Sequence, residues 1–149
     1  MPITPKLGTE AAAANMADIA PRYTPQEAII EAGRCLFCFD APCIQACPTG
    51  IDIPSFIKKI TTGNLTGSAR AILSANILGG SCARVCPTEV LCEGACVVLD
   101  REGDPVKIGR LQRYVTDRAL ERRRQLLKTP ARKSGKRVAV LGGGPAGLG

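Results

Sequence analysis

Eight cysteines in two short runs constrain this chain of 149 residues more than any other feature. The first run is Cys35-x2-Cys38-x4-Cys43-x3-Cys47-Pro48, and the second is Cys82-x3-Cys86-Pro87-x4-Cys92-x3-Cys96. Both contain the pattern Cys-x3-Cys-Pro, an internal echo. Residues 35–48 are too short and too rich in cysteine for a packed element and predict a loop wrapped around a bound group. In the second run, Thr88 could cap one or two helical turns.

The N-terminal segment bears on which chemistry these cysteines serve. Residues 1–20 lack the basic start and apolar run of a signal peptide. No apolar stretch approaches the roughly 18 residues of a membrane span. We therefore expect a cytoplasmic protein without a membrane partner. In a reducing compartment, closely spaced cysteines are typical of metal ligands or redox groups rather than of disulfides.

The spacing of the cysteines favours iron–sulfur clusters over zinc. Bacterial ferredoxins use a short cysteine run ending in Cys-Pro, and the cysteine before that proline binds the other cluster. Three thiolates from one tight loop can bind three irons of a cubane, whereas the fourth ligand has to come from elsewhere in the chain. Two [4Fe–4S] clusters held by interlocked loops are therefore predicted. Iron and acid-labile sulfide would distinguish them from the alternatives, which are zinc, disulfides and free thiols.

Zinc is the main alternative to iron–sulfur clusters. An all-cysteine zinc site usually presents two Cys-x2-Cys hooks, and only Cys35 and Cys38 form one here. A zinc-stapled, non-catalytic interaction module that docks through its basic helix is thus the competing interpretation from another functional class.

Composition excludes several other chemistries. The chain has no histidine, which rules out Ser-His and Cys-His catalytic pairs and histidine-bound zinc or haem. Aromatic residues make up only 3% of the chain, so nucleic-acid binding by base stacking is not expected.

The net charge of +7 is distributed unevenly. Residues 101–137 hold 13 Lys/Arg against 4 Asp/Glu, whereas residues 1–100 hold 7 against 9. This basic excess predicts a solvated helix face and a flexible joint. A docking surface for an acidic partner or for cofactor phosphates is the alternative.

Apolar periodicity and capping signals predict an all-α fold. Thr24, Pro25 and Glu27 form a capping-box pattern that opens a helix ending at Gly33. Further helices are expected from Pro54 with a stop at Gly63, over about 68–77 with Gly79-Gly80 as the stop, and over about 108–127. A turn is expected over 99–105.

The last thirteen residues change character. Residues 137–149 read RVAVLGGGPAGLG, which predicts a buried β-strand running into a glycine loop with Gly142, Gly144 and Gly147 at Gly-x-Gly-x-x-Gly spacing. A strand followed by this pattern is typical of the start of a dinucleotide-binding Rossmann domain. The helix that would receive the pyrophosphate is absent from the sequence, so we expect a fragment of a longer protein that cannot retain FAD alone. The predicted organisation is a flexible lead-in over 1–23, a helical domain over 24–127, a linker over 128–136 and a truncated FAD-binding domain over 137–149.

Four motifs together carry a family resemblance: the first cysteine run, CARVCPTEVLCEGAC, KIGRLQRYVTD and VAVLGGGPAGLG. From about Thr24 to its end, the chain resembles the N-terminal iron–sulfur domain of the dihydropyrimidine dehydrogenase and glutamate synthase small-subunit family. The closest branch is the small NAD(P)H-oxidising subunit of bacterial dihydropyrimidine dehydrogenase. The resemblance implies an α-helical ferredoxin domain with two [4Fe–4S] clusters and crossed ligation.

The resemblance also implies a ligand set. The first cluster would be held by Cys35, Cys38, Cys43 and Cys96. The second would be held by Cys47, Cys86, Cys92 and Gln112, the last in the IG-x2-Q pattern. Cys82 would then be a buried thiol that binds no iron.

Gln112 is the main reason for preferring the dihydropyrimidine dehydrogenase branch. The resemblance implies Gln at this position in that branch and Glu in the glutamate synthase branch. It shares a helical face with Ile108 and Val115, so a core-edge Gln bonded to backbone is the structural alternative.

The resemblance implies an electron circuit whose chemistry lies largely outside these residues. NAD(P)H would reduce FAD in the following domain, and electrons would cross the iron–sulfur clusters to a second subunit that carries FMN and the pyrimidine site. The glutamate synthase-type subunit, with another final acceptor, is the alternative within the family.

Overall fold

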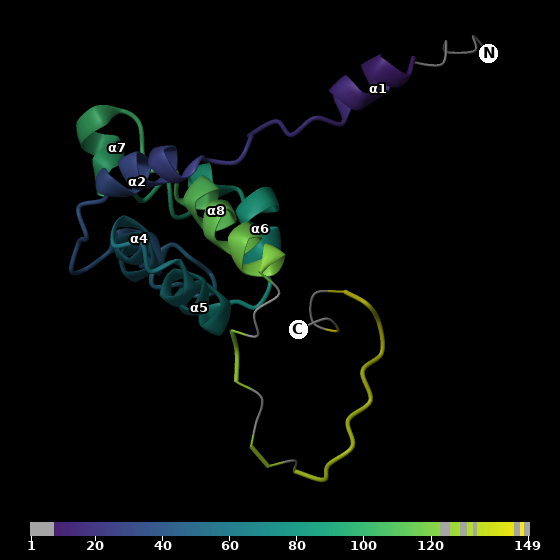
Figure 1. Ribbon diagram of the computed structural model, residues 1–149. Helices are drawn as coiled ribbons and strands as arrows, with labels where there is room; N and C mark the ends of the chain where they lie inside the picture. Colours follow the sequence, from purple (N-terminus) through teal and green to yellow (C-terminus); the bar gives the residue numbers. More distant parts are fainter. Residues whose placement is uncertain (1–7, 123–125, 129–130, 133, 145–146, 148–149) are drawn as a thin grey trace.

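The computed structural model describes residues 8–122, 126–128, 131–132, 134–144 and 147. Within them the fold is helical and contains no β-strand, in agreement with the predicted all-α class (Figure 1). No helix in these ranges is both long enough and apolar enough to cross a membrane. The elements are α1 (Thr9–Asn15), α2 (Pro25–Gly33), α3 (Pro42–Gln45), α4 (Ile53–Thr61), α5 (Leu65–Ala75), α6 (Gly79–Val85), the 3-10 turn η1 (Thr88–Val90), α7 (Val97–Glu102) and α8 (Ile108–Glu121).

Side-chain caps explain where several helices begin. The capping box of α2 is confirmed, because Thr24 Oγ1 accepts from the Glu27 N–H at 3.3 Å and Glu27 Oε2 accepts from the Thr24 N–H at 2.7 Å. Asp52 caps α4, accepting from the Ser55 N–H at 3.1 Å. Asn64 caps α5, which therefore starts at Leu65, three residues before the predicted position.

Two predictions around the second cysteine run were wrong. The pair Gly79-Gly80 opens α6 instead of only ending the preceding helix, which stops at Ala75. Part of the predicted turn over 99–105 belongs to α7, which ends at Glu102 and is followed by Gly103 as its C-cap, with φ of 71°. A glycine in a helical pattern indicates a helix boundary. The sequence alone does not show whether a helix ends or begins at that glycine.

The hydrophobic core lies between α4, α5 and α8, with α2 packed on α4 and α8 (Figure 1). Its largest side chains are Phe56, Ile57 and Ile60 from α4, Ile72 from α5, and Ile108, Leu111 and Val115 from α8, all at most 2% exposed. The helix α6 packs along α8 on the other side. This core leaves the two cysteine runs at its edges, joined to it by short connections.

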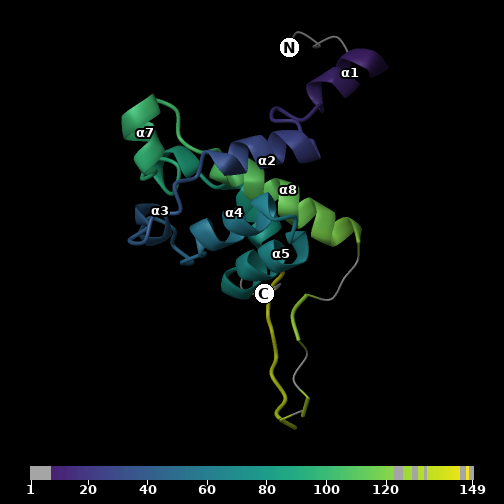
Figure 2. The ribbon, with the colours of Figure 1, turned by 60° about the vertical axis from the view of Figure 1, so that its left-hand side comes forward.

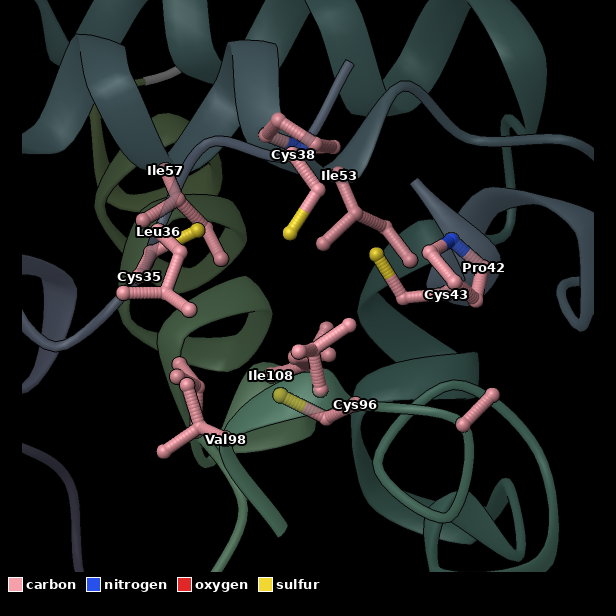
Figure 3. A pocket seen from close by; sticks show the side chains of 14 residues that line it. Cys35, Leu36, Cys38, Pro42, Cys43, Ile53, Ile57, Cys96, Val98 and Ile108 are labelled. Carbon is pink, nitrogen blue, oxygen red and sulfur yellow. The ribbon is translucent and has the colours of Figure 1, made fainter. Parts of the chain in front are cut away.

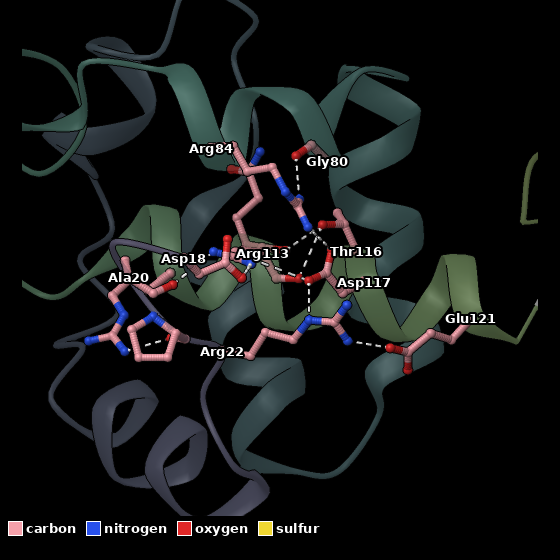
Figure 4. Close-up of polar contacts among 12 residues, drawn as sticks. Asp18, Ala20, Arg22, Gly80, Arg84, Arg113, Thr116, Asp117 and Glu121 are labelled. Carbon is pink, nitrogen blue, oxygen red and sulfur yellow. Dashed lines mark hydrogen bonds and ion pairs between the residues drawn. The ribbon is translucent and has the colours of Figure 1, made fainter. Parts of the chain in front are cut away.

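A buried carboxylate ties the N-terminal segment and α6 to α8. Asp117 on α8 is 4% exposed and lies 2.6 Å from Arg84 Nη2 and 3.0 Å from Arg22 Nε (Figure 4). Arg113 on α8 also donates to the Ala20 carbonyl at 2.8 Å and pairs with Asp18 at 2.6 Å. Residues 18–22 thus lie along α8, while α1 projects away from the helical body in both ribbon views (Figures 1 and 2).

The described part of the C-terminal segment forms no strand. Residues 134–142 have no regular secondary structure and are largely exposed. An isolated strand has no partner for its backbone N–H and C=O groups, so the predicted strand requires a sheet that these residues do not supply. Within the predicted glycine loop, the Gly147 N–H donates to the Gly144 carbonyl at 2.9 Å and Gly142 has φ of 106°. The Rossmann assignment of this segment stays a prediction.

Candidate metal centre

Four cysteines from both runs line a first pocket. Cys35, Cys38 and Cys43 come from the segment between α2 and α4, and Cys96 directly precedes α7. Their sulfur atoms point into a common cavity (Figure 3). Apolar side chains form most of the remaining wall, namely Leu36, Ile53, Ile57, Val98, Val106 and Ile108.

Backbone conformation shapes this first pocket. Phe37 has φ of 52° and Ala41 has φ of 28°, conformations that are uncommon for residues with a side chain. They bracket Cys38 and turn the chain twice within five residues. This bending brings Cys38 and Cys43 to the same cavity as Cys35.

The thiols of the first pocket are held in an environment that disfavours free thiolates. Burial raises the pKa of the Cys43 thiol to about 11, with further contributions from the neighbouring Cys35 and Cys96. Burial likewise raises the pKa of Cys35. Several thiolates in an apolar cavity need a positive centre to compensate their charge. The donor set therefore fits a cationic iron–sulfur core.

A second pocket gathers the other four cysteines. It is lined by Cys47 from the first run and by Cys82, Cys86 and Cys92 from the second. Gln112, Asn76, Thr88 and Gly109 complete the polar and small parts of its wall. Each pocket thus receives cysteines from both runs, because Cys96 joins the first pocket and Cys47 joins the second.

Hydrogen bonds distinguish Cys47 from its neighbours. Burial alone would raise its pKa, but bonds from the Thr49 hydroxyl and from the backbone N–H groups of Ile51, Thr49 and Gly50 lower it. By contrast, burial and the adjacent Glu93 raise the pKa of Cys92 to about 12. The segment after Cys47 therefore stabilises a thiolate with backbone donors, as expected for a sulfur that carries negative charge onto a metal.

Gln112 lies on the inward face of α8, as its position relative to Ile108 and Val115 predicted, and is 7% exposed. Its amide nitrogen donates to the carbonyl oxygen of Gly79 at 2.7 Å. No described residue donates a hydrogen bond to its side-chain oxygen. The nitrogen end of the amide is thus fixed, which leaves the oxygen end for the second pocket.

Sequence reasoning missed three residues that shape the second pocket. Gly79 provides the carbonyl that fixes Gln112, and Asn76 donates to Cys82 Sγ at 3.0 Å. Glu93, 8% exposed, accepts from the Gly109 N–H in the first turn of α8 at 2.9 Å. A buried acid between two cysteines has no periodic signal. Asn76 falls inside the helix predicted over about 68–77, whereas the observed helix ends at Ala75, so its position in the connection to α6 was missed.

Within the described ranges, no three His, Cys, Asp or Glu side chains lie close enough together to hold a single metal ion. A polynuclear cluster has its ligands on different metal atoms and so accommodates a wider arrangement than a tetrahedral zinc, whose sulfurs all lie at about 2.3 Å from one ion.

Comparison with known proteins identifies the family. Residues 12–124 match the family described as dihydropyrimidine dehydrogenase domain II, 4Fe-4S cluster. The chain is 47% identical over 131 residues to the NAD-dependent dihydropyrimidine dehydrogenase subunit PreT of Escherichia coli O157:H7. It is also 47% identical over 133 residues to the PreT homolog of Salmonella typhi. Each match covers 88% of this chain and 31% of the relative, so the chain spans about a third of the length of these relatives.

These matches favour the dihydropyrimidine dehydrogenase branch over the glutamate synthase branch, and a 4Fe-4S domain over a zinc module. The predicted resemblance is thereby confirmed. The chain belongs to the family of 4Fe-4S cluster domains of dihydropyrimidine dehydrogenase.

Proposed function

We propose that this chain is the electron-transfer part of a dihydropyrimidine dehydrogenase-type oxidoreductase and carries two [4Fe–4S] clusters. The observation that carries the proposal is the presence of two separate pockets, each lined by four cysteine thiols drawn from both runs. The family and the relatives' names, which describe a subunit of an NAD-dependent dihydropyrimidine dehydrogenase, support the same function.

The proposed ligand sets follow the two pockets. The first set is Cys35, Cys38, Cys43 and Cys96, which are the four cysteines that line the first pocket. The second set is Cys47, Cys86, Cys92 and Gln112, which line the second pocket together with Cys82. In this proposal the crossed contributions of Cys47 and Cys96 bind the two loops to each other.

The clusters supply one-electron uptake and release when bound. The residues of this chain set the conditions for that transfer. Apolar side chains such as Ile53, Ile57 and Ile108 limit water around the first pocket. Backbone N–H groups after Cys47 donate to its sulfur, which stabilises additional negative charge on reduction.

Gln112 would give the second set one formal negative charge less than four thiolates. A less negative ligand set accepts an electron more readily, so the amide raises the reduction potential relative to a fourth cysteine. The two sets would then differ in potential, as is useful for directional transfer.

The electron donor and acceptor of this proposal lie outside the described helices. FAD, reduced by NAD(P)H, would be bound by the Rossmann domain that Gly142, Gly144 and Gly147 begin. The acceptor would be an FMN site in a second subunit, consistent with relatives that are themselves named as subunits.

Metal analysis of the anaerobically purified holoprotein tests the proposal. We expect about eight irons and about eight acid-labile sulfides per chain, the content of two cubanes. Cys86→Ala and Cys96→Ala are each expected to lose one cluster. Cys96→Ala should leave the same remaining spectrum as Cys38→Ala, because both belong to the first set.

Cys82→Ala is the matched control and should retain both clusters. A colourless, zinc-containing protein would contradict the function. Equal iron loss in Cys82→Ala and Cys86→Ala would contradict the assignment of the second set.

A further inference from the structure

The second pocket offers five donors for a cluster that takes four. Cys47, Cys82, Cys86 and Cys92 provide thiols, and Gln112 provides an amide. With Cys47, Cys86 and Cys92 as ligands, as in the proposed second set, Cys82 and Gln112 compete for the fourth position. The identity of the fourth ligand sets the charge of the cluster, because a thiolate is negative and an amide is neutral.

The hydrogen bonds of the two competitors differ. The Gln112 amide is fixed at its nitrogen by the Gly79 carbonyl at 2.7 Å, and its oxygen accepts no hydrogen bond from any described residue. Gln112 lines the second pocket, so its amide oxygen is available there to a metal ion or cluster. The sulfur of Cys82 is held by a side-chain amide, Asn76 Nδ2 at 3.0 Å. The donors to the Cys47 sulfur, by contrast, are the Thr49 hydroxyl and backbone N–H groups of its own loop.

Asn76 is itself held rigidly in the corner between α5 and α6. Its side-chain oxygen accepts from the Leu78 N–H at 3.0 Å, which fixes the orientation of the amide with the NH2 group toward Cys82. Its backbone N–H donates to the Ile72 carbonyl at 2.9 Å, and its carbonyl accepts from the Gly79 N–H at 2.9 Å. One of these bonds fixes the side-chain amide and the other two fix the backbone that carries it, so the NH2 group has little freedom to turn away from the sulfur.

The same corner therefore serves both competitors. Gly79 fixes the nitrogen of Gln112, and Asn76, three residues earlier, holds Cys82. The short connection between α5 and α6 thus leaves the Gln112 oxygen facing the pocket and holds the Cys82 thiol by a hydrogen bond.

We propose that Asn76 determines the ligand set of the second cluster by keeping the Cys82 thiol out of coordination, so that Gln112 is the fourth ligand. The inference rests on the proposed function. When the Asn76 amide is removed, Cys82 replaces Gln112: the thiol releases its proton to solvent, an iron–sulfur bond forms, and the bond from iron to the Gln112 oxygen breaks. No oxidant or reductant takes part in this exchange.

The exchange changes the charge of the cluster and hence its spectroscopy. A thiolate in place of a neutral amide adds one negative charge, which disfavours reduction. The reduction potential of the second cluster should therefore shift to more negative values, and its electron paramagnetic resonance spectrum should change to that of an all-cysteine site. A purely structural role of Asn76 would lower stability without this coupled change.

Redox titration of the holoprotein with Asn76→Ala tests the inference. We expect full iron content, a more negative potential for the second cluster only, and a return to the wild-type potential in the double variant Asn76→Ala/Cys82→Ser. Asn76→Asp is the second variant, because its carboxylate keeps the acceptor for the Leu78 N–H and loses the donor to sulfur. The variant Asn76→Asp/Cys82→Ser is its control for the added charge.

Each outcome separates the inference from the function on which it rests. A wild-type protein without a second [4Fe–4S] cluster would overturn the proposed function. Two intact clusters with an unchanged potential in Asn76→Ala would overturn only the inference. Loss of the second cluster in Cys82→Ser would show that Cys82 is itself the ligand, with Asn76 as its hydrogen-bond donor, and would also overturn the inference.

Discussion

At the scale of single residues, the two adjacent glycines at the start of α6 differ in how much space surrounds them. A Cβ added at Gly79 would lie 2.5 Å from Ile72 Cγ2, inside a fully buried part of the core. The nearest heavy atom to a Cβ at Gly80 would be Thr116 Oγ1 at 3.7 Å, an ordinary contact. Gly79 therefore permits the close approach of α6 to α5 that brings its carbonyl to Gln112, whereas Gly80 only continues the helix.

We expect Gly79→Ala to lower the free energy of unfolding by about 1–3 kcal/mol, because Ile72 or the start of α6 has to move. The same movement loosens the hydrogen bond to Gln112. Gly80→Ala is the matched control and should be neutral or stabilising by up to about 1 kcal/mol, since alanine favours a helix. Urea denaturation followed by circular dichroism measures both. Equal destabilisation by the two variants would contradict this account of Gly79.

Glu93 is a second single residue with a role that is visible only in three dimensions. It is 8% exposed, burial raises its pKa, and its carboxylate accepts the Gly109 N–H at the start of α8. The N-cap residue of α8, Lys107, provides no side-chain acceptor for the first turn of the helix. The second cysteine run thus supplies the missing acceptor to the helix that carries Gln112.

Glu93→Ala should therefore destabilise the fold by about 1–3 kcal/mol, the cost of a buried donor without a partner. Glu93→Gln keeps an acceptor oxygen of the same reach and should retain most of the stability. The urea midpoints of the two holoprotein variants provide the measurement. If Glu93→Gln is as unstable as Glu93→Ala, the carboxylate charge rather than the acceptor matters.

At the scale of elements, sequence patterns predicted helices well where a local signal decides the boundary. The start of α2 depends on Thr24 and Glu27, three residues apart, and was predicted correctly. The start of α6 at Gly79 depends on packing against Ile72, seven residues away, and was not. Local capping chemistry can be recognised in a sequence, whereas a close approach between two helices cannot.

The basic excess of α8 shows a similar limit. Its arginines predicted a solvated face or a docking surface, but Arg110 lies 4.0 Å from the Tyr23 ring and donates to the Pro21 carbonyl at 2.9 Å. Arg113 binds Ala20 and Asp18. Much of the positive charge of α8 thus holds the N-terminal segment, a contact between residues about ninety positions apart that no local pattern indicates.

Asp117 is the element-scale test of this arrangement, because it connects α8 to α6 and to Arg22. We expect Asp117→Ala to destabilise the protein by about 1–3 kcal/mol, since Arg113, 11% exposed, loses a buried partner. Glu121→Ala removes an exposed pair with Arg22 and should cost at most about 1 kcal/mol. Thermal unfolding of both variants checks the difference, and similar losses would contradict the central role of Asp117.

At the scale of the whole molecule, the candidate site joins two segments that pack on the edge of the core and bury few side chains of their own. Cys35, Cys38 and Cys43 could be grouped from their spacing, but the assignment of Cys96 and Cys47 to opposite pockets required a family resemblance. Periodicity placed Gln112 on the inward face of α8, while the resemblance alone gave it a role. The path of the chain through α4 and α5 brings cysteines from the two runs into the same pockets. Neither run contains a sequence pattern that predicts this path.

This division between core and site predicts how the protein responds to loss of its clusters. Most of the large, fully buried apolar side chains lie in α4, α5 and α8, whereas the described cysteine segments, 35–51 and 82–96, bury only Ala41, Ile51, Cys92 and Glu93. Ordering residues costs conformational free energy, and these segments have little burial to offset it without a bound cluster. Oxidative removal of iron in the presence of a chelator should therefore release the two cysteine segments first.

Hydrogen–deuterium exchange of the holo and iron-free protein measures this release. We expect backbone amides of 35–51 and 82–96 to lose protection by at least about tenfold, while amides of α4 and α5 around Phe56 and Ile72 change much less. The holoprotein exposed to the same chelator without oxidant is the control. Uniform loss of protection across both regions would instead mean that the clusters stabilise the entire domain, so that the helical core has no stability of its own.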